Sequence, residues 1–178
     1  MTGDILKLVV VGAVIIVLGA LYLSMRPWLR RRAPEFSEDA QRAIGFARVE
    51  AEQLKSTSIE PGHLLLGLLH IPDPTLALLI PLQDHDSIRQ EVRDRIEGAA
   101  LVTYRDDLPF SDEARQALVA AAREARGFSS PVITSKHLLL GLLHADTSVA
   151  ALVLRERGLR LESVREQVAG WPQVLSTP

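Results

Sequence analysis

Hydrophobic and polar positions along this chain follow one pattern that occurs twice. Residues 36–80 and 110–154 align without a gap at an offset of 74 residues, and both contain the segment HLLLGLLH. A repeat of this length indicates that one structural unit has been duplicated. We therefore expect two equivalent units to make up most of the chain beyond its first 35 residues.

Each copy begins with the pattern of an amphipathic helix. Apolar residues recur at three- and four-residue spacing after Ser37 and again after Ser111, which places them on one helical face. A serine followed by two acidic residues is a typical helix start, because the hydroxyl caps free amides and the carboxylates favour the positive end of the helix dipole. Phe36 and Phe110 precede the two serines and are expected to pack onto the turns that follow.

Three further helices are predicted in each copy. Loops are expected at 55–60 and 127–134, where polar residues or glycine and proline interrupt the apolar pattern. The expected second, third and fourth helices cover 61–70, 74–82 and 86–97 in the first copy and 135–144, 147–157 and 161–169 in the second.

The second helix of each copy is the predicted centre of the fold. Its LLLGLL segment is apolar on all sides, which is typical of a helix buried on every face. Glycine costs a helix about 1 kcal/mol relative to alanine, so Gly67 and Gly141 at equivalent positions indicate a close approach of another helix. The predicted fold is all-α, with eight helices in two four-helix units related by a pseudo-twofold axis.

The predicted domain covers residues 36–170. Its first repeat covers 36–97 and its second 110–169, and a short tail follows at 171–178.

An apolar segment near the N-terminus predicts a membrane anchor. Residues 5–25 are apolar apart from Lys7, Tyr22 and Ser24. Twenty-one helical residues span roughly 31 Å, close to the thickness of about 30 Å of a bilayer's hydrocarbon core. A cleaved signal peptide is the alternative, but it requires basic residues before the apolar run and an A-x-A site after it. The sequence has neither arrangement, so we favour the anchor.

Basic residues follow the apolar segment in a linker at 26–35. These residues are Arg26, Arg30, Arg31 and Arg32. Positive charge beside a membrane span marks its cytoplasmic side. We therefore expect a single-pass cell-membrane protein with its N-terminus outside and the duplicated domain in the cytoplasm.

Composition and charge narrow the classes of partner. The chain has no cysteine, which excludes disulfides and thiolate metal sites. Residues 36–178 carry 15 basic and 20 acidic side chains, a net charge of −5. Nucleic-acid binding requires a basic face, so this charge argues against nucleic acid as a partner.

The four histidines of the repeated segment are the main candidates for metal ligands in this sequence. They are His63, His70, His137 and His144. A zinc site would require them to converge, with oriented partners behind them. We favour a structural role, in which His63 and His137 form hydrogen bonds at a helix start and His70 and His144 interact with the negative C-terminal end of a helix.

No catalytic motif is present in the sequence. It contains neither a G-x-S-x-G nucleophile elbow nor a G-x-x-x-x-G-K-[ST] phosphate loop. We therefore expect no enzyme activity, no cofactor and no bound metal, and keep an enzyme or metal protein only as a third hypothesis.

The duplicated motif resembles a known family. A Phe-Ser helix start, a short loop and an H-L-L-L-G-L-L helix, occurring twice about 75 residues apart, resemble the N-terminal domain of Clp unfoldases such as ClpA and ClpC over residues 36–169. The resemblance implies a non-catalytic domain that docks adaptor proteins and receives substrates for a protease. The missing phosphate loop and the apolar N-terminal segment depart from the family pattern.

The resemblance also implies candidate site residues. In domains of the ClpC type, a hydroxyl after the Phe and a glutamate before the motif's first histidine help to bind phosphorylated arginine. The hydroxyls correspond to Ser37 and Ser111, but Gly62 and Lys136 replace the glutamates. A guanidinium needs a carboxylate partner, so the substitutions argue against phosphoarginine, and we regard these four residues as candidates for protein or peptide binding.

Two functions remain open from the sequence. The leading hypothesis is a membrane-anchored protein-binding module whose partners are Clp unfoldase components, their adaptors or their substrates. The alternative is a structural or self-associating scaffold of a membrane complex.

Overall fold

The computed structural model describes residues 34–96 and 108–170. The predicted membrane helix at 5–25, the four arginines that follow it and the tail at 171–178 lie outside the described residues. Within the described ranges, no single helix has the length and apolar character needed to cross a bilayer. One helix pair, Ser135–His144 with Val149–Glu156, passes that test jointly, but it is bent by 101°.

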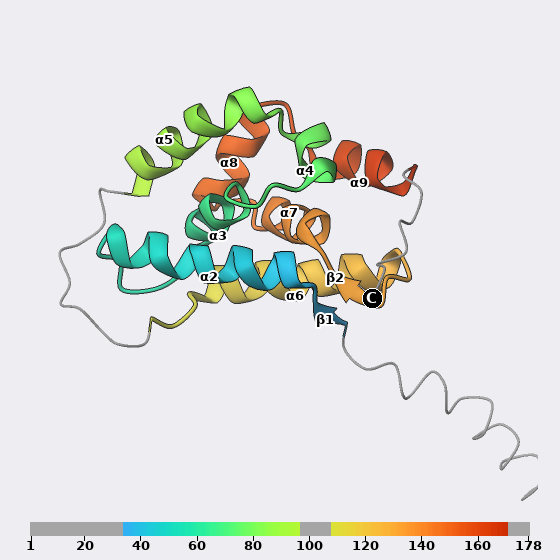
Figure 1. The fold of residues 1–178 in the computed structure, drawn as a ribbon, viewed down its shortest axis with the longest axis horizontal. Coiled ribbons are helices and arrows are strands. Elements are labelled where there is room, and N and C mark those ends of the chain that lie inside the picture. The colour runs from blue at the N-terminus through green and yellow to red at the C-terminus, as the bar shows by residue number, and fades with distance from the viewer. Residues whose placement is uncertain (1–33, 97–107, 171–178) are drawn as a thin grey trace, which may run out of the picture. The chain divides into compact units, whose positions relative to one another are not determined.

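The described part of the chain contains eight α-helices, as the repeat predicts (Figure 1). In the first copy they are α2 (Glu38–Gln53), α3 (Pro61–Leu68), α4 (Pro74–Leu79) and α5 (His85–Ile96). In the second copy they are α6 (Asp112–Gly127), α7 (Ser135–His144), α8 (Val149–Glu156) and α9 (Leu161–Ala169). A 3-10 turn, η1 (Leu82–Asp84), and two short strands, β1 (Glu35–Phe36) and β2 (Val132–Ile133), complete the elements.

The two long helices begin at the predicted caps. The Ser37 hydroxyl accepts a hydrogen bond from the Ala40 amide at 3.3 Å, and the Ser111 hydroxyl accepts one from the Ala114 amide at 3.1 Å. Each bond satisfies an amide that has no partner within its helix.

The third helices are shorter than the sequence predicts. Helix α4 ends at Leu79 rather than at residue 82, because Pro81 disfavours helical geometry in the residue before it. Helix α8 begins at Val149 rather than at residue 147, because Ser148 is its N-cap and accepts a hydrogen bond from the Ala151 amide at 3.2 Å.

Helices α3 and α7 lie at the centre of the core, as predicted. Every residue of α3 is buried, and α3 packs on both α2 and α7. A Cβ atom added to Gly67 would meet the carbonyl oxygen of Ala43 and lie 2.6 Å from the Ala47 amide nitrogen. Gly141 approaches α6 in the same way. Both glycines therefore allow a central helix to touch the backbone of a long helix.

The two copies are joined by reciprocal backbone pairing that the sequence did not reveal. Strands β1 and β2 are parallel, and the Ser37 amide donates to the Ile133 carbonyl at 2.9 Å. At the equivalent place, the Ser111 amide donates to the Ile59 carbonyl at 3.1 Å. The segment that enters each long helix thus pairs with the segment that enters the other copy's central helix. This reciprocal pairing agrees with the pseudo-twofold axis that the repeat predicts between the two copies.

Candidate protein-docking site

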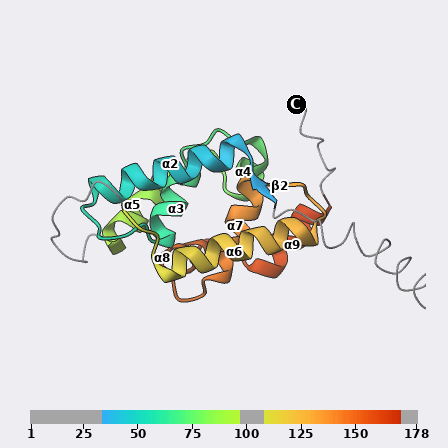
Figure 2. The same cartoon turned by 90° about the horizontal axis from the view of Figure 1, so that it is seen from below.

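A groove runs between the two long helices. Helices α2 and α6 run in opposite directions and are set apart from each other, with α3 and α7 packed between and behind them (Figures 1 and 2). The depression between them holds about 250 Å³, including space open to solvent. We call it the repeat groove. Its lining residues are Ala43, Ile44, Leu64, Ala117, Leu118, Leu138 and Leu142.

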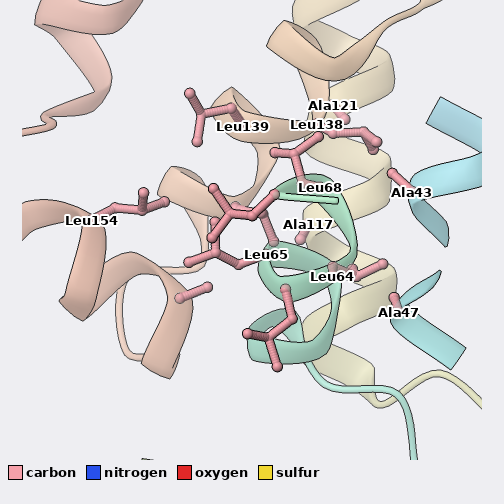
Figure 3. Close-up of a cluster of buried hydrophobic side chains, with 14 of the residues drawn as sticks. Ala43, Ala47, Leu64, Leu65, Leu68, Ala117, Ala121, Leu138, Leu139 and Leu154 are labelled. Carbon is pink, nitrogen blue, oxygen red and sulfur yellow. The ribbon is translucent and has the colours of Figure 1, made fainter. Parts of the chain in front are cut away.

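Small side chains on the long helices leave this space open. Ala43 and Ala117 are fully buried against the central leucines, while Ile44 and Leu118 are only half-buried. Figure 3 shows Leu64 and Leu138 close to the alanines of the two long helices. These two leucines keep 5% and 6% of their surface exposed, whereas the adjacent Leu65 is fully buried. The groove therefore exposes a small part of the leucine core.

The chemistry of the groove favours apolar contacts. All the lining side chains are aliphatic, and the helical walls use their backbone groups in their own hydrogen bonds. The lining therefore offers a ligand apolar contact but no side-chain hydrogen bond or charge.

The four residues implied by the family resemblance form two composite sites. The bond from the Ser37 amide to Ile133 places Ser37 beside the start of α7, where Lys136 lies. The bond from the Ser111 amide to Ile59 likewise places Ser111 beside the start of α3, where Gly62 lies. The backbone of each serine is therefore paired with the segment that leads to the substituted position of the other copy. None of the four residues lines the repeat groove.

These four positions differ in what they offer a ligand. Gly62 is buried, and a Cβ atom there would lie 2.6 Å from Cδ1 of Ile96. Lys136 is partly buried, and this desolvation lowers the pKa of its ammonium, while the negative charge of Asp73 acts in the opposite direction. The Ser37 and Ser111 hydroxyls already cap their helices. Lys136 is thus the only one of the four with a long side chain to extend to a partner.

His63 and His137 have the structural role that the sequence favours. The Nδ1 atom of His63 accepts a hydrogen bond from the Glu60 amide at 2.9 Å, and that of His137 accepts one from the Thr134 amide at 3.0 Å. Both rings are fully buried, and this burial lowers the pKa of each imidazole to about 4. The two histidines are therefore neutral parts of the helix starts.

His70 and His144 have partners that the sequence analysis missed. The Nε2 atom of His70 lies 2.9 Å from a carboxylate oxygen of Glu50, and Arg93 also binds this carboxylate, at 2.8 Å. The second copy repeats the arrangement with Glu124, His144 and Arg165. We call these two sets the glutamate triads. Each joins the first and fourth helices of its own copy to the C-terminal end of the second, where His70 lies just beyond α3 and His144 is the last residue of α7.

The sequence does contain one sign of the glutamate triads, which is a glutamate at the same position in both copies. Glu50 and Glu124 occupy the same position in the two copies, directly before the buried Ala51 and Ala125. Their side chains are nearly buried, with 4% and 9% of the surface exposed. The hydrogen bonds and charges of arginine and histidine outweigh this desolvation and lower the pKa of both carboxyl groups. Both glutamates are therefore ionised at neutral pH.

The described residues contain no group of three or more histidine, aspartate or glutamate side chains that could hold a metal ion. The four histidines of the repeated segment instead bond to the helix starts and to the glutamate triads.

Acidification should destabilise the fold through the two buried histidines. The folded state keeps His63 and His137 neutral down to about pH 4, whereas the unfolded chain protonates them near pH 6.5. The stability that comes from keeping these two histidines neutral is fully present above pH 6.5 and is lost as the pH falls towards 4. At pH 5, each histidine should have lowered the free energy of unfolding by about 2 kcal/mol. Urea titrations at pH 7, 6 and 5 measure this loss.

A variant with His63→Asn and His137→Asn provides the comparison. The Asn side-chain oxygen can replace Nδ1 as the acceptor, and it does not titrate. We expect its free energy of unfolding to change far less between pH 7 and pH 5. An equal loss in both proteins would contradict the assignment.

Comparisons with known proteins identify similar domains. Residues 109–175 match the family model described as the Clp repeat (R) N-terminal domain. The ATP-binding subunit ClpC of the ATP-dependent Clp protease from Staphylococcus aureus (strain USA300) is 29% identical over 136 residues. The alignment covers 74% of this chain and 16% of ClpC, so the chain spans only a small part of its relative.

Solved structures show the same fold. The N-terminal domain of the chaperone ClpD from Arabidopsis thaliana is 28% identical, with a TM-score of 0.61, and the match covers 75% of this chain and 92% of that one. The Hsp104 N-terminal domain from Candida albicans has a TM-score of 0.61 at 18% identity, over 76% of this chain and 90% of that one. Together these findings establish a Clp N-domain-like fold and show that the second copy of the repeat, within residues 109–175, is similar to the Clp repeat (R) N-terminal domain.

Proposed function

We propose that this chain is a non-catalytic docking module, which holds a Clp-type N-terminal domain at a membrane and binds apolar segments of other proteins in the repeat groove. The observation that carries the proposal is the aliphatic lining of that groove, partly open to solvent, in a fold similar to the N-terminal domain of ClpD. Its partners are Clp unfoldase components, their adaptors or their substrates.

The membrane part of the proposal rests on the amino-acid sequence. Residues 5–25 form the anchor, and Arg26, Arg30, Arg31 and Arg32 keep the domain on the cytoplasmic side. Protease added to spheroplasts should leave the domain intact, and permeabilisation should expose it. Digestion from outside, or recovery of the chain in the soluble fraction, would refute this part.

Substitutions at the groove rim test the docking function. We expect Ile44→Asp and Leu118→Asp each to reduce capture of apolar peptides by at least about tenfold, because a carboxylate at the rim must lose water when a peptide binds. Both residues are half-buried, so the fold should tolerate the change better than it would at a core leucine.

Val49→Asp is the matched control. Val49 also lies on α2 and is 45% exposed, but it does not line the groove. It should leave peptide capture unchanged, and circular dichroism should show that all three variants are folded. Equal loss in the control, or full binding in both rim variants, would overturn the docking proposal.

Lys136 supplies a second candidate contact beside Ser37. Its ammonium gives that composite site a positive charge, which suits an acidic group on the partner. Lys136→Glu should slow the association of an acidic partner and reverse its salt dependence, as measured by surface plasmon resonance.

A further inference from the structure

We propose that a surface beside the first glutamate triad binds a segment of another protein in which an apolar side chain stands next to a carboxylate. The surface consists of Phe46, His70 and Arg93, and we call it the triad shelf. None of these three residues lines the repeat groove. The triad shelf is therefore a second docking surface, and it does not depend on peptide binding in the groove.

Phe46 supplies the apolar part of the triad shelf. It lies on α2 with 41% of its surface exposed, and its ring stacks on that of His70, with ring centroids 5.0 Å apart and planes inclined by 27°. The Nε2 atom of His70 lies 2.9 Å from a carboxylate oxygen of Glu50, which fixes the imidazole. Because both rings are held in place before a partner arrives, an aliphatic or aromatic side chain can pack on them at a small cost in entropy.

Arg93 supplies the polar part of the triad shelf. Its Nε and Nη2 atoms donate to the Glu50 carboxylate. No described residue accepts a hydrogen bond from its Nη1 atom, which is open to solvent. The Arg93 side chain is 34% exposed and that of Glu50 only 4%, so a partner meets the guanidinium and not the carboxylate behind it. The two free N–H groups of Nη1 favour a carboxylate as their acceptor.

The exposed phenylalanine is not needed to build a triad. The residue that corresponds to Phe46 in the second copy is Ala120, 74 positions later, and it is 8% exposed. Glu124 and His144 of the second triad nevertheless lie within hydrogen-bonding distance, at 2.8 Å. The ring of Phe46 therefore has no counterpart in the second triad and is open to a partner.

Arg93 is also specific to the first copy. Helices α5 and α9 begin 76 positions apart, so Arg93 corresponds to Ala169, whereas Arg165 of the second triad corresponds to Arg89. Arg89 donates to the Leu69 carbonyl instead. An aromatic ring and an additional guanidinium thus meet on one surface of the first copy alone. Aromatic and arginine side chains are enriched at protein interfaces and among the residues that dominate their binding energy.

Fluorine NMR tests whether a ligand reaches the triad shelf. The chain has four phenylalanines, so fluorophenylalanine in the full chain, held in lipid nanodiscs, provides one reporter at each of them, and Phe46→Leu identifies the signal of Phe46. The probes are two ten-residue Gly/Ser peptides, one with a central Leu-Glu pair and the other with a central Leu-Gln pair. We expect the Leu-Glu peptide to shift the Phe46 signal.

The two peptides differ only in one charge, so their affinities measure the contribution of the guanidinium. Fluorescence anisotropy should show that the Leu-Glu peptide binds about fivefold more tightly than the Leu-Gln peptide at low salt, as expected for a partly exposed ion pair. This preference should decrease as salt is added. Equal affinities of the two peptides would overturn the proposal.

Arg93→Lys separates the free nitrogen from the buried ion pair. Lysine keeps a positive charge beside Glu50 but lacks Nη1, so the preference for the Leu-Glu peptide should fall below about twofold. Arg165→Lys is the matched control and should leave both affinities unchanged; the same loss of preference there would contradict the assignment. Phe46→Ala gives the first copy the alanine that the second already has, so it should fold, and it should weaken both peptides by about fivefold.

Other occupants of the triad shelf give different results. A Phe46 signal that shifts with protein concentration in the absence of peptide would show that a second copy covers the shelf, and would overturn the proposal. Binding of the Leu-Glu peptide without a shift of the Phe46 signal would do the same, and so would loss of its binding in Ile44→Asp, which would place it in the repeat groove. Docking in the groove is tested separately, by the capture of apolar peptides, and each proposal can fail while the other stands.

Discussion

Replacing Gly67 by alanine is expected to lower the free energy of unfolding by about 3 kcal/mol, at the upper end of typical overpacking costs. The added methyl group would collide with the Ala43 carbonyl oxygen and lie 2.6 Å from the Ala47 amide nitrogen. These are backbone atoms of α2, so no side-chain rotation relieves the contact. The two helices must separate, and the leucines between them lose packing. Urea unfolding measures the effect.

Gly45→Ala is the matched control for this substitution. Gly45 lies within α2, is exposed, and a Cβ atom there would meet nothing within 4 Å. Alanine is the better helix former, so this variant should gain about 0.5–1 kcal/mol. Gly141→Ala should resemble Gly67→Ala, since its Cβ would lie 2.9 Å from the Ala121 amide nitrogen. Similar effects at Gly45 and Gly67 would contradict the close-approach explanation.

Replacing Arg93 by methionine should cost about 3 kcal/mol of stability, because it removes the charged partner of a buried carboxylate. Only 4% of the Glu50 side chain is exposed, and Arg93 binds both of its oxygens, at 2.8 and 2.9 Å. Without arginine, His70 is the only remaining partner in the triad. The pKa of Glu50 should therefore rise, and Arg165→Met should affect Glu124 in the same way.

A double-mutant cycle separates this effect from loss of packing. In Glu50→Gln/Arg93→Met no buried charge remains, so the double variant should be more stable than Arg93→Met alone. Arg42→Met removes an exposed ion pair with Asp39 and should cost less than about 1 kcal/mol. A double variant less stable than Arg93→Met would show that the carboxylate does not need its partner.

Much of the fold follows from local patterns in the sequence. Ser37 and Ser111 predict the helix starts, because capping depends on a hydroxyl three residues before a free amide. The all-apolar segments predict α3 and α7 at the centre, because no other position covers them on every side. The boundaries of the third helices were predicted less well, since a cap at Ser148 and a proline at 81 decide them.

The candidate site was harder to predict. Residues separated by 74 positions in the sequence are equivalent in the two copies. This offset does not show which residues of one copy lie close to which residues of the other. Only backbone pairing shows that Ser37 lies near the start of α7, the helix that carries Lys136 of the other copy. The glutamate triads were missed for the same reason, because Arg93 lies 43 residues from Glu50.

The sequence alone determined that this protein is a duplicated all-α domain with buried central helices, because apolar periodicity, caps and glycines act within a few residues. Only the tertiary structure decided three other features. The segment that leads into each long helix pairs with the other copy, two glutamates are buried with charged partners, and an aliphatic groove lies between α2 and α6. These features depend on how distant helices pack, and packing is set by the shapes and charges that meet across the whole core.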